Sequence, residues 1–188
     1  MLKESEQLFW AKGNIAAKII RPFGQYTFLL KPPGGVWRFR LHVSMSEFDN
    51  QCHVIDLTGN GSRSEYQYQG AGKFLVNTMI QFTQKHLAPN TVVFGEMSSQ
   101  GDPSGRQGID CAQNRVAFWE SFGFKKKEPR QGQPPYCHPF SATLSSLATR
   151  RGKLFNECAC LVSLDEFKLT DRTDEFDRYP TSFTNQLT

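Results

Sequence analysis

The chain has 188 residues, 38% hydrophobic and 21% charged, which suits one globular domain with a substantial core. No run approaches the ~20 apolar residues that a membrane-spanning helix needs, which excludes an integral membrane protein of that kind. The net charge of +4 is mild, and the first residues turn acidic at once with no apolar run behind them. The sequence therefore predicts no secretory signal, no membrane association and a cytoplasmic protein.

The five cysteines are odd in number and scattered along the chain. Cys158 and Cys160 are separated by one residue rather than the two of a zinc knuckle or a redox pair. His138 and Cys137 are neighbours, but no second pair of ligands stands at workable spacing. The sequence therefore predicts buried thiols and no metal site.

The first third of the chain indicates a short helix followed by an antiparallel meander. Residues 3–12 are typical of a helix that Gly13 ends. Apolar or alternating runs bounded by turn residues then predict strands at 15–21, 26–31, 36–43 and 52–57.

The pattern changes after residue 72. Five apolar residues recur at helical spacing over 72–86, namely Phe74, Leu75, Met79, Ile80 and Phe82. The elements predicted next are a strand at 91–97, a polar loop at 98–110, a helix at 112–122 and a strand at 124–127. The rest is predicted as a proline-rich loop at 128–140, one or two helical turns at 141–150, a strand at 154–164 and a polar tail at 170–188.

Residues 67–72, Gln-Tyr-Gln-Gly-Ala-Gly, lie between a predicted strand and the helix at 72–86. Glycines let the backbone approach a ligand closely, and a helix N-terminus presents unpaired N–H groups with a partial positive charge. The turn therefore favours a phosphate site, for which Lys73 is well placed. A plain helix-entry turn would show the same six residues, so both interpretations stay open on this motif alone. The third spaced glycine of a dinucleotide fingerprint and the Gly-Lys-Ser/Thr of a P-loop are both missing.

A second segment, Asn-Arg-Val-Ala-Phe-Trp-Glu-Ser-Phe-Gly-Phe at 114–124, lies on the next predicted helix. Together the two segments resemble the GNAT superfamily of N-acetyltransferases. In that family the acetyl-CoA turn reads Gln/Arg-x-x-Gly-x-Gly/Ala, and the later helix carries an Asn, an Ala, an aromatic pair and a closing Gly-Phe. The resemblance covers about residues 52–127 and, more loosely, 154–164. It implies an α+β fold, with one domain over 1–169 whose twisted, mostly antiparallel central sheet is flanked by helices.

The resemblance implies acetyl-CoA as co-substrate. The pantetheine amides would pair with a splayed strand around residues 55–58, the pyrophosphate would lie on the N–H groups of 69–73, and Asn114 would approach the pantetheine arm. The residues thereby assigned to the coenzyme are Leu57, Thr58, Gln67, Gln69, Gly70, Ala71, Gly72, Lys73, Asn114 and Phe118.

Transfer to an amine needs a group that takes a proton from it. Glu96, at the end of a strand, is the first candidate, with Asp56 and Glu65 as weaker ones. Many family members have a Tyr acid where this chain has Trp119, whose indole N–H cannot serve as an acid near neutral pH. Trp119 is therefore expected to pack, and Tyr136 is assigned as the acid. The alternatives to Tyr136 are Tyr68, Cys111, His138 and departure of the thiolate without an acid.

The acceptor is an amine whose class the sequence leaves open, because the first 50 residues lack the pair of helices that usually forms one acceptor wall. A small molecule, a protein and a charged tRNA are the options, and a homodimer is one option for assembly. The alternative function is a catalytically weak or inactive protein of this fold that binds coenzyme A, RNA or a protein partner. RNA enters because residues 121–153 carry seven bases and one acid, or +6.

Overall fold

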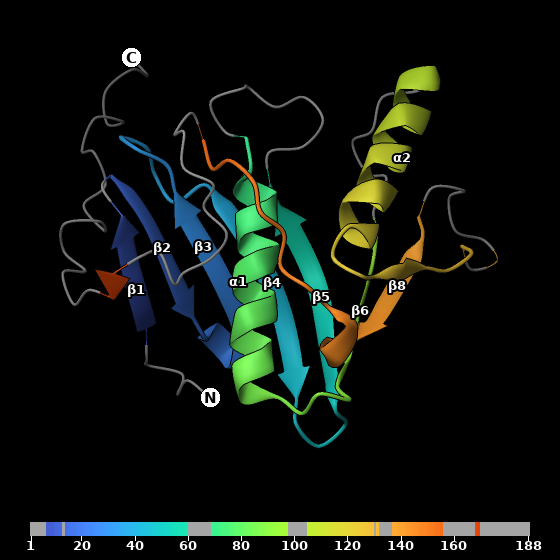
Figure 1. The fold of residues 1–188 in the computed structure, drawn as a ribbon, viewed down its shortest axis with the longest axis horizontal. Helices are drawn as coiled ribbons and strands as arrows, with labels where there is room; N and C mark the ends of the chain where they lie inside the picture. The colour runs from blue at the N-terminus through green and yellow to red at the C-terminus, as the bar shows by residue number, and fades with distance from the viewer. Residues whose placement is uncertain are drawn as a thin grey trace, which may run out of the picture.

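The computed structural model describes residues 7–12, 14–59, 69–97, 105–129, 131, 137–155 and 168–169. These residues contain two α-helices and nine strands (Figure 1). In chain order they are β1 (Gln7–Lys12), β2 (Ile15–Ile20), β3 (Gln25–Lys31), β4 (Phe39–Ser46), β5 (Gln51–Thr58), α1 (Ala71–His86), β6 (Val92–Glu96), α2 (Arg106–Glu120), β7 (Lys125–Lys126), β8 (Pro139–Thr143) and β9 (Lys168–Leu169). Two short 3-10 helices lie at Pro22–Gly24 and Leu144–Ser146.

The strands form a single sheet in the order β7-β8-β6-β5-β4-β3-β2-β1-β9. The pair β5–β6 is parallel, and the other pairs are antiparallel. The fold is therefore α+β, as the sequence predicts, but with a mixed sheet. The parallel pair follows from α1, which lies between β5 and β6 in the chain and carries it back to the starting edge.

One face of the sheet carries the core. On β4, Phe39, Leu41 and Val43 are buried while the residues between them face the other side. Helix α1 covers the buried face over β3 and β4, and α2 packs Trp119 on Phe140 of β8 with ring centroids 4.4 Å apart. Both helices lie on this face in the described part of the chain (Figure 1), so the opposite face of β4, β5 and β6 is not covered by them.

The strongest sequence patterns are confirmed. Helix α1 spans Ala71–His86 against the predicted 72–86, because its apolar residues recur every three or four positions and fill the core. The predicted strands at 15–21, 26–31, 52–57, 91–97 and 124–127 match β2, β3, β5, β6 and β7 to within a few residues. Strand β4 is displaced from the predicted 36–43 to Phe39–Ser46.

The helix predicted over residues 3–12 is wrong where the structure describes it. Residues Gln7–Lys12 form β1, which pairs with β2 along its whole length from Gln7↔Ile20 to Lys12↔Ile15. The connection is two residues long, and its sequence, Gly13-Asn14, is typical of hairpins. Six residues of cross-strand pairing therefore override the local helix preference of the polar residues.

Two predictions in the second half are also corrected. The loop predicted over 98–110 ends early, since α2 begins at Arg106. Its first two turns bury only Gly108 and Ala112, so they lack a strong apolar pattern. The helical turns predicted at 141–150 are replaced by the end of β8 and one 3-10 turn at Leu144–Ser146, because β8 pairs with both β6 and β7.

Most of the strand predicted at 154–164 and the whole tail predicted at 170–188 lie outside the described residues. Neither described helix is long and apolar enough to cross a membrane.

Candidate functional site

The central parallel strands separate partway along their length. Strand β5 pairs with β6 from Gln51↔Val92 to Val54↔Gly95, and β5 then continues to Thr58 without that partner. The pairing with β4 also shifts at this point, because Val54 lies opposite Val43 and Asp56 opposite His42. Ile55 is thus an extra residue, a β-bulge, and such bulges bend a strand away from its neighbour.

Gly95 sets the point of separation. A Cβ at this position would lie 2.7 Å from Cζ of Phe140 and 2.8 Å from the carbonyl oxygen of Val54. Only glycine lets the last paired residue of β6 pass this close to β5 and β8. The gap beyond it therefore opens at a fixed place in the sheet.

The N-terminus of α1 follows β5 in the chain. Gly70 is its N-cap with φ of 87°, and the first helical hydrogen bond runs from the Phe74 N–H to the Gly70 carbonyl at 2.9 Å. The N–H groups of Ala71, Gly72 and Lys73 precede that bond and have no i−4 acceptor in the helix. No acidic side chain occupies the first turn. This helix end is suited to an anion.

Three parts of the chain meet beside this turn. A Cβ at Gly59, just after β5, would lie 3.1 Å from the Gly72 Cα, so the two glycines pack backbone to backbone. A Cβ at Gly72 would in turn lie 3.6 Å from Cζ of Phe118 on α2. Gly72 and Phe118, one from each of the two sequence segments noted above, are thereby brought together at the end of the separating strand.

A cationic segment crosses the same helix end. Asn77, fully buried on α1, donates to the Arg150 carbonyl and accepts from the Arg150 N–H, both at 2.8 Å. The Phe155 N–H donates to the Gln69 carbonyl at 2.7 Å, and a side chain at Gly70 would overlap the Lys153 carbonyl. These contacts hold residues 150–155 along α1.

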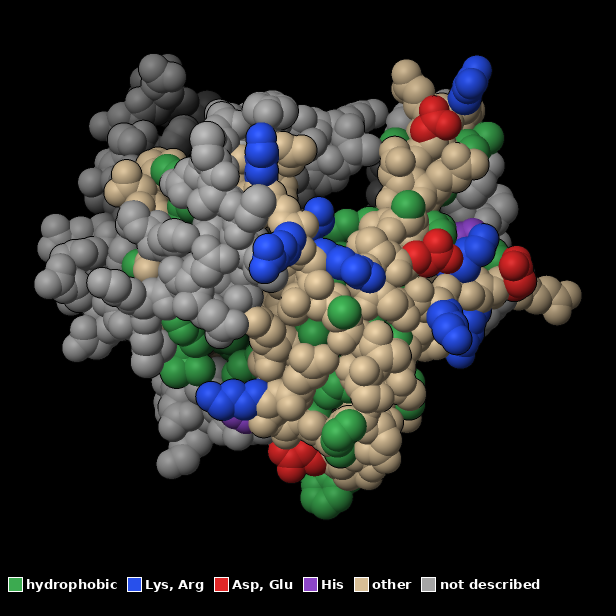
Figure 2. All heavy atoms as spheres, in the orientation of Figure 1, with side chains coloured by type: hydrophobic (Ala, Val, Ile, Leu, Met, Phe, Trp, Pro, Cys, Tyr) green, Lys and Arg blue, Asp and Glu red, His purple; other side chains and the backbone are tan. Residues whose placement is uncertain are grey.

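Two cations of this segment form a cluster with Lys73, whose Nζ lies 3.5 Å from the Arg151 carbonyl oxygen. We call Lys73, Arg151 and Lys153 the cationic cluster. Arg150 is not part of it, since its Nε donates to the Ser121 carbonyl just after α2. Figure 2 shows Lys and Arg side chains gathered where this segment crosses α1, beside a hollow that borders the N-terminal half of α2. The cluster adds positive charge to a helix end that already favours an anion.

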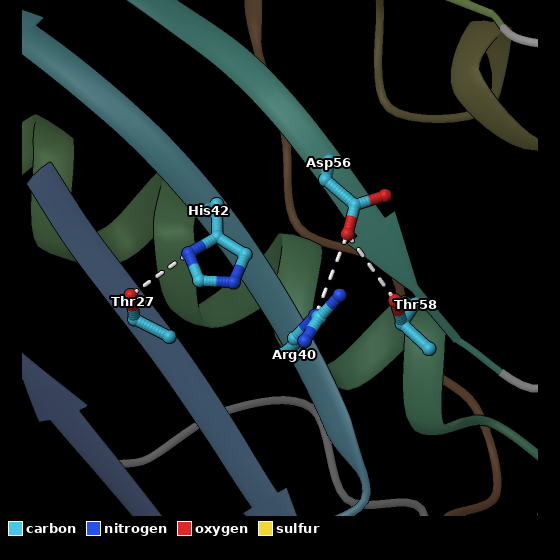
Figure 3. A network of polar contacts seen from close by, with 5 residues as sticks. All are labelled: Thr27, Arg40, His42, Asp56 and Thr58. Atoms are coloured by element: carbon cyan, nitrogen blue, oxygen red, sulfur yellow. Dashed lines mark hydrogen bonds and ion pairs between the residues drawn. The ribbon is translucent and has the colours of Figure 1, made fainter.

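The opposite face of the sheet carries a polar network beside the bulge (Figure 3). The Asp56 carboxylate lies 3.5 Å from Nε of Arg40 and accepts from the Thr58 hydroxyl at 3.3 Å. His42 lies opposite Asp56, and its Nδ1 is 2.9 Å from the hydroxyl oxygen of Thr27. The pKa of His42 is lowered by burial and by Arg40, against an opposing effect of Asp56.

Glu96 ends β6 on this same face, and its side chain is exposed. It stands next to Gly95, where β6 leaves β5, so carboxylates from the two separating strands flank the gap. Cys52, on the core face of β5, is buried, and burial raises its pKa to about 12, which removes it as a nucleophile. Within the described ranges no three His, Cys, Asp or Glu side chains are grouped as a metal site.

The structure gives the following positions for the coenzyme residues assigned from the sequence. Gln69 is exposed before α1, and Gly70, Ala71, Gly72 and Lys73 form its cap and first turn. Leu57 is half-buried and Thr58 exposed on the end of β5, which pairs with β4 but not with β6. Asn114 is exposed on α2, one turn before the half-buried Phe118, so both lie on one side of that helix.

Trp119 packs in the core, as expected. It is 5% exposed, stacks on Phe140 and meets the ring of Phe124 edge-on. Its indole is therefore turned into the sheet. Cys111 and His138 are half-buried, and His138 Nδ1 lies 3.1 Å from the Lys127 carbonyl oxygen. Gln67, Tyr136, Glu65 and Tyr68 lie outside the described residues.

The location of several basic and polar side chains could not be predicted from the sequence. In the sequence Arg150, Arg151 and Lys153 belong only to a basic stretch, whereas the fold places them along α1, with contacts to residues 73 and 78 positions earlier in the chain. Lys125 and Lys126 of that stretch form β7, at the sheet edge. His42 and Thr27 carried no signal at all, since their pairing depends on strand register.

Comparisons with known proteins add a weak likeness in fold. No protein-family model matches the chain, and a search of curated protein sequences gives no significant match. Among solved structures, the crystal structure of nourseothricin acetyltransferase matches with a TM-score of 0.46 and 14% sequence identity, over 69% of this chain and 72% of that chain. We infer neither substrate nor activity from this likeness.

Proposed function

We propose that this chain is an N-acetyltransferase that moves an acetyl group from acetyl-CoA to an amine. The observation that carries the proposal is the separation of β5 from β6 directly beside a glycine-capped, cation-flanked helix end. Coenzyme A has the matching shape, since an anionic pyrophosphate is joined to a long arm that contains two amides and ends in the sulfur.

The coenzyme would lie with its pyrophosphate at the first turn of α1. The N–H groups of residues 71–73 and the side chain of Lys73 would face the phosphates, with Arg151 and Lys153 nearby. The pantetheine arm would run along the end of β5, whose residues Leu57 and Thr58 have no β6 partner. Asn114 and Phe118 would border it from α2.

The thioester would then reach the gap beyond Gly95, where Glu96 and Asp56 approach from the two strands. Carboxylates there attract an amine in its ordinary ammonium form, and a carboxylate at Glu96 can accept a proton from it. Tyr136 keeps its assignment as the acid for the departing thiolate. The buried ring of Trp119 does not take this role.

Acetyl transfer is tested by thiol release from acetyl-CoA in the presence of spermidine, lysine ethyl ester and other primary amines. The wild type is expected to release coenzyme A faster with at least one amine than without. Because a positioned acid or base contributes about 10²–10⁴-fold to a rate, Glu96→Gln should lower kcat/KM by at least about tenfold. Glu47→Gln, an exposed change in the turn before β5, serves as the matched control.

The outcomes separate catalysis from binding. Binding of acetyl-CoA without acetylation of any amine would favour the non-catalytic alternative. Amine-dependent release that Glu96→Gln leaves unchanged would remove Glu96 from the reaction but keep the activity.

A further inference from the structure

His42 holds a position that the proposed reaction does not yet use. It lies on the open face of β4, directly opposite Asp56 and one strand from the gap that ends at Glu96. Its ring is fixed by the bond between Nδ1 and Thr27 Oγ1, and Thr27 is itself only 3% exposed. Figure 3 shows the ring lying over β4 with its other nitrogen, Nε2, turned away from Thr27.

The bulge at Ile55 produces this arrangement. Without the extra residue, Asp56 would fall one position out of register and point to the core face. With it, Asp56 and Thr58 both lie on the open face, opposite His42 and Arg40. The same backbone irregularity that parts β5 from β6 thus sets a carboxylate beside an imidazole.

The surroundings favour an uncharged imidazole. Burial lowers the pKa of His42 first, the charge of Arg40 on the same strand adds to that, and Asp56 on β5 opposes it. The other titratable groups on this face include His53 on β5, which stacks on Phe94, Glu96 on β6, Lys31 on β3 and Lys18 on β2, while the β3 residue paired with His42 is the neutral Thr27. His42 is therefore a free base at neutral pH.

We infer that His42, in place of Glu96, is the proton acceptor for an amine that arrives on the open face as an ammonium ion, and that the Glu96 carboxylate attracts this ion. This rests on the proposed acetyl transfer and assigns its chemistry to a residue on the acceptor side. When the Thr27 hydroxyl oxygen accepts from Nδ1–H, the Nε2 lone pair is left for the substrate. Imidazole is the side-chain base whose ordinary pKa lies nearest neutrality.

The proposed step balances as follows. The ammonium group gives one proton to Nε2 of His42 and becomes a neutral amine. Its nitrogen bonds to the thioester carbon, the carbon–sulfur bond breaks, and the sulfur leaves with the electron pair. This step uses the alternative in which the thiolate leaves without a separate acid. The nitrogen loses its second proton to the thiolate, which gives the amide and coenzyme A, and His42 passes its proton to water.

The test is the pH profile of kcat/KM between pH 5 and 7 with an alkylamine, which stays an ammonium ion throughout this window. Because neutral His42 is the active form, the wild-type rate should fall as the pH falls through a pKa below about 6.5, the ordinary value for histidine. His42→Asn keeps a short group that can bond Thr27 but cannot accept a proton. It should lower kcat/KM by at least about tenfold and abolish this acid limb.

A second variant guards against a folding defect. His42→Ala should regain rate when imidazole is added, which a purely structural role would not produce. His86→Gln is the matched control, since burial also lowers the pKa of His86 but this residue lies at the far end of α1. It should keep the wild-type profile.

Three results would overturn the inference in distinguishable ways. If the wild type acetylates no amine, both the proposed function and the role of His42 are wrong. Acetylation with an unchanged acid limb in His42→Asn ends only the role of His42. If His42→Ala binds acetyl-CoA normally but its lower rate is not restored by imidazole, His42 has a structural role instead.

Discussion

Gly95 carries the geometry of the gap at the scale of one residue. Its hydrogen is the only group that fits between the Phe140 ring and the Val54 carbonyl. A larger side chain there would push β6 away from β5 or displace Phe140, which stacks on Trp119. The separation of the strands therefore depends on a residue that takes no part in the reaction.

Gly95→Ala should accordingly destabilise the fold by about 1–3 kcal/mol, the usual range for overpacking a filled core. Urea unfolding followed by tryptophan fluorescence measures this change. Gly72→Ala is the control, since its Cβ would be in ordinary contact with Phe118 at 3.6 Å. If Gly95→Ala were as stable as the wild type, a methyl group would fit at this position, and the argument for a glycine at the point of separation would be wrong.

Element α1 and the segment at 150–155 act as one unit. Asn77 lies about two turns beyond the cap and bonds both backbone groups of Arg150, so a buried carboxamide holds the start of the segment that carries Arg151 and Lys153. No sequence pattern marks this contact, because it joins residues 73 positions apart.

Asn77→Ala should cost about 2 kcal/mol, because it leaves two backbone groups of Arg150 without their partner. It should also weaken coenzyme binding, as the segment that carries Arg151 and Lys153 loses its tether. Gln84→Ala is the matched control. Gln84 also lies on α1 and donates to backbone carbonyls, those of Leu144 and Leu147, but it is far from the cap. The idea fails if both variants bind coenzyme A equally well.

Elements with strong periodicity were predictable from the sequence. The apolar spacing of α1 and the runs of β2, β3, β5 and β6 follow from which residues must be buried. β1 was missed because only its pairing with β2 distinguishes it from a helix. The candidate site divides in the same way. The turn at 70–73 is local and visible in the sequence. His42 meets Thr27 through the register of β3 and β4, and it meets Asp56 through the bulge in β5, and neither leaves a mark in the composition.

At the scale of the whole molecule, the basic residues of 121–153 fall into two places. Lys125 and Lys126 lie on the edge strand β7, whereas Arg151 and Lys153 lie against α1. Only the second group adjoins the helix end. Net charge alone therefore says little about where an anion binds.

Charge reversal separates the two groups. Arg151→Glu with Lys153→Glu should weaken coenzyme A binding at least about tenfold and reduce its salt dependence, because like charge then faces the phosphates. Lys125→Glu with Lys126→Glu makes the same change in net charge at β7 and should leave the affinity nearly unchanged. Equal losses in the two double variants would indicate a general charge effect rather than a site.

The position of the coenzyme is tested most directly by calorimetric titration of acetyl-CoA into the wild type and into Gly72→Glu. The Cβ of the glutamate would be in ordinary contact with Phe118, and its charge would suit the helix dipole, yet it would place a carboxylate where the phosphates are proposed to bind. Gly70→Trp is unsuitable, since it would collide with Lys153. Gln107→Glu adds the same charge to the first turn of α2 and is the control.

We expect the wild type and Gln107→Glu to bind acetyl-CoA with similar affinity and Gly72→Glu, although folded, to lose binding. Absence of binding by the wild type, or undiminished binding by Gly72→Glu, would contradict a coenzyme site at the N-terminus of α1.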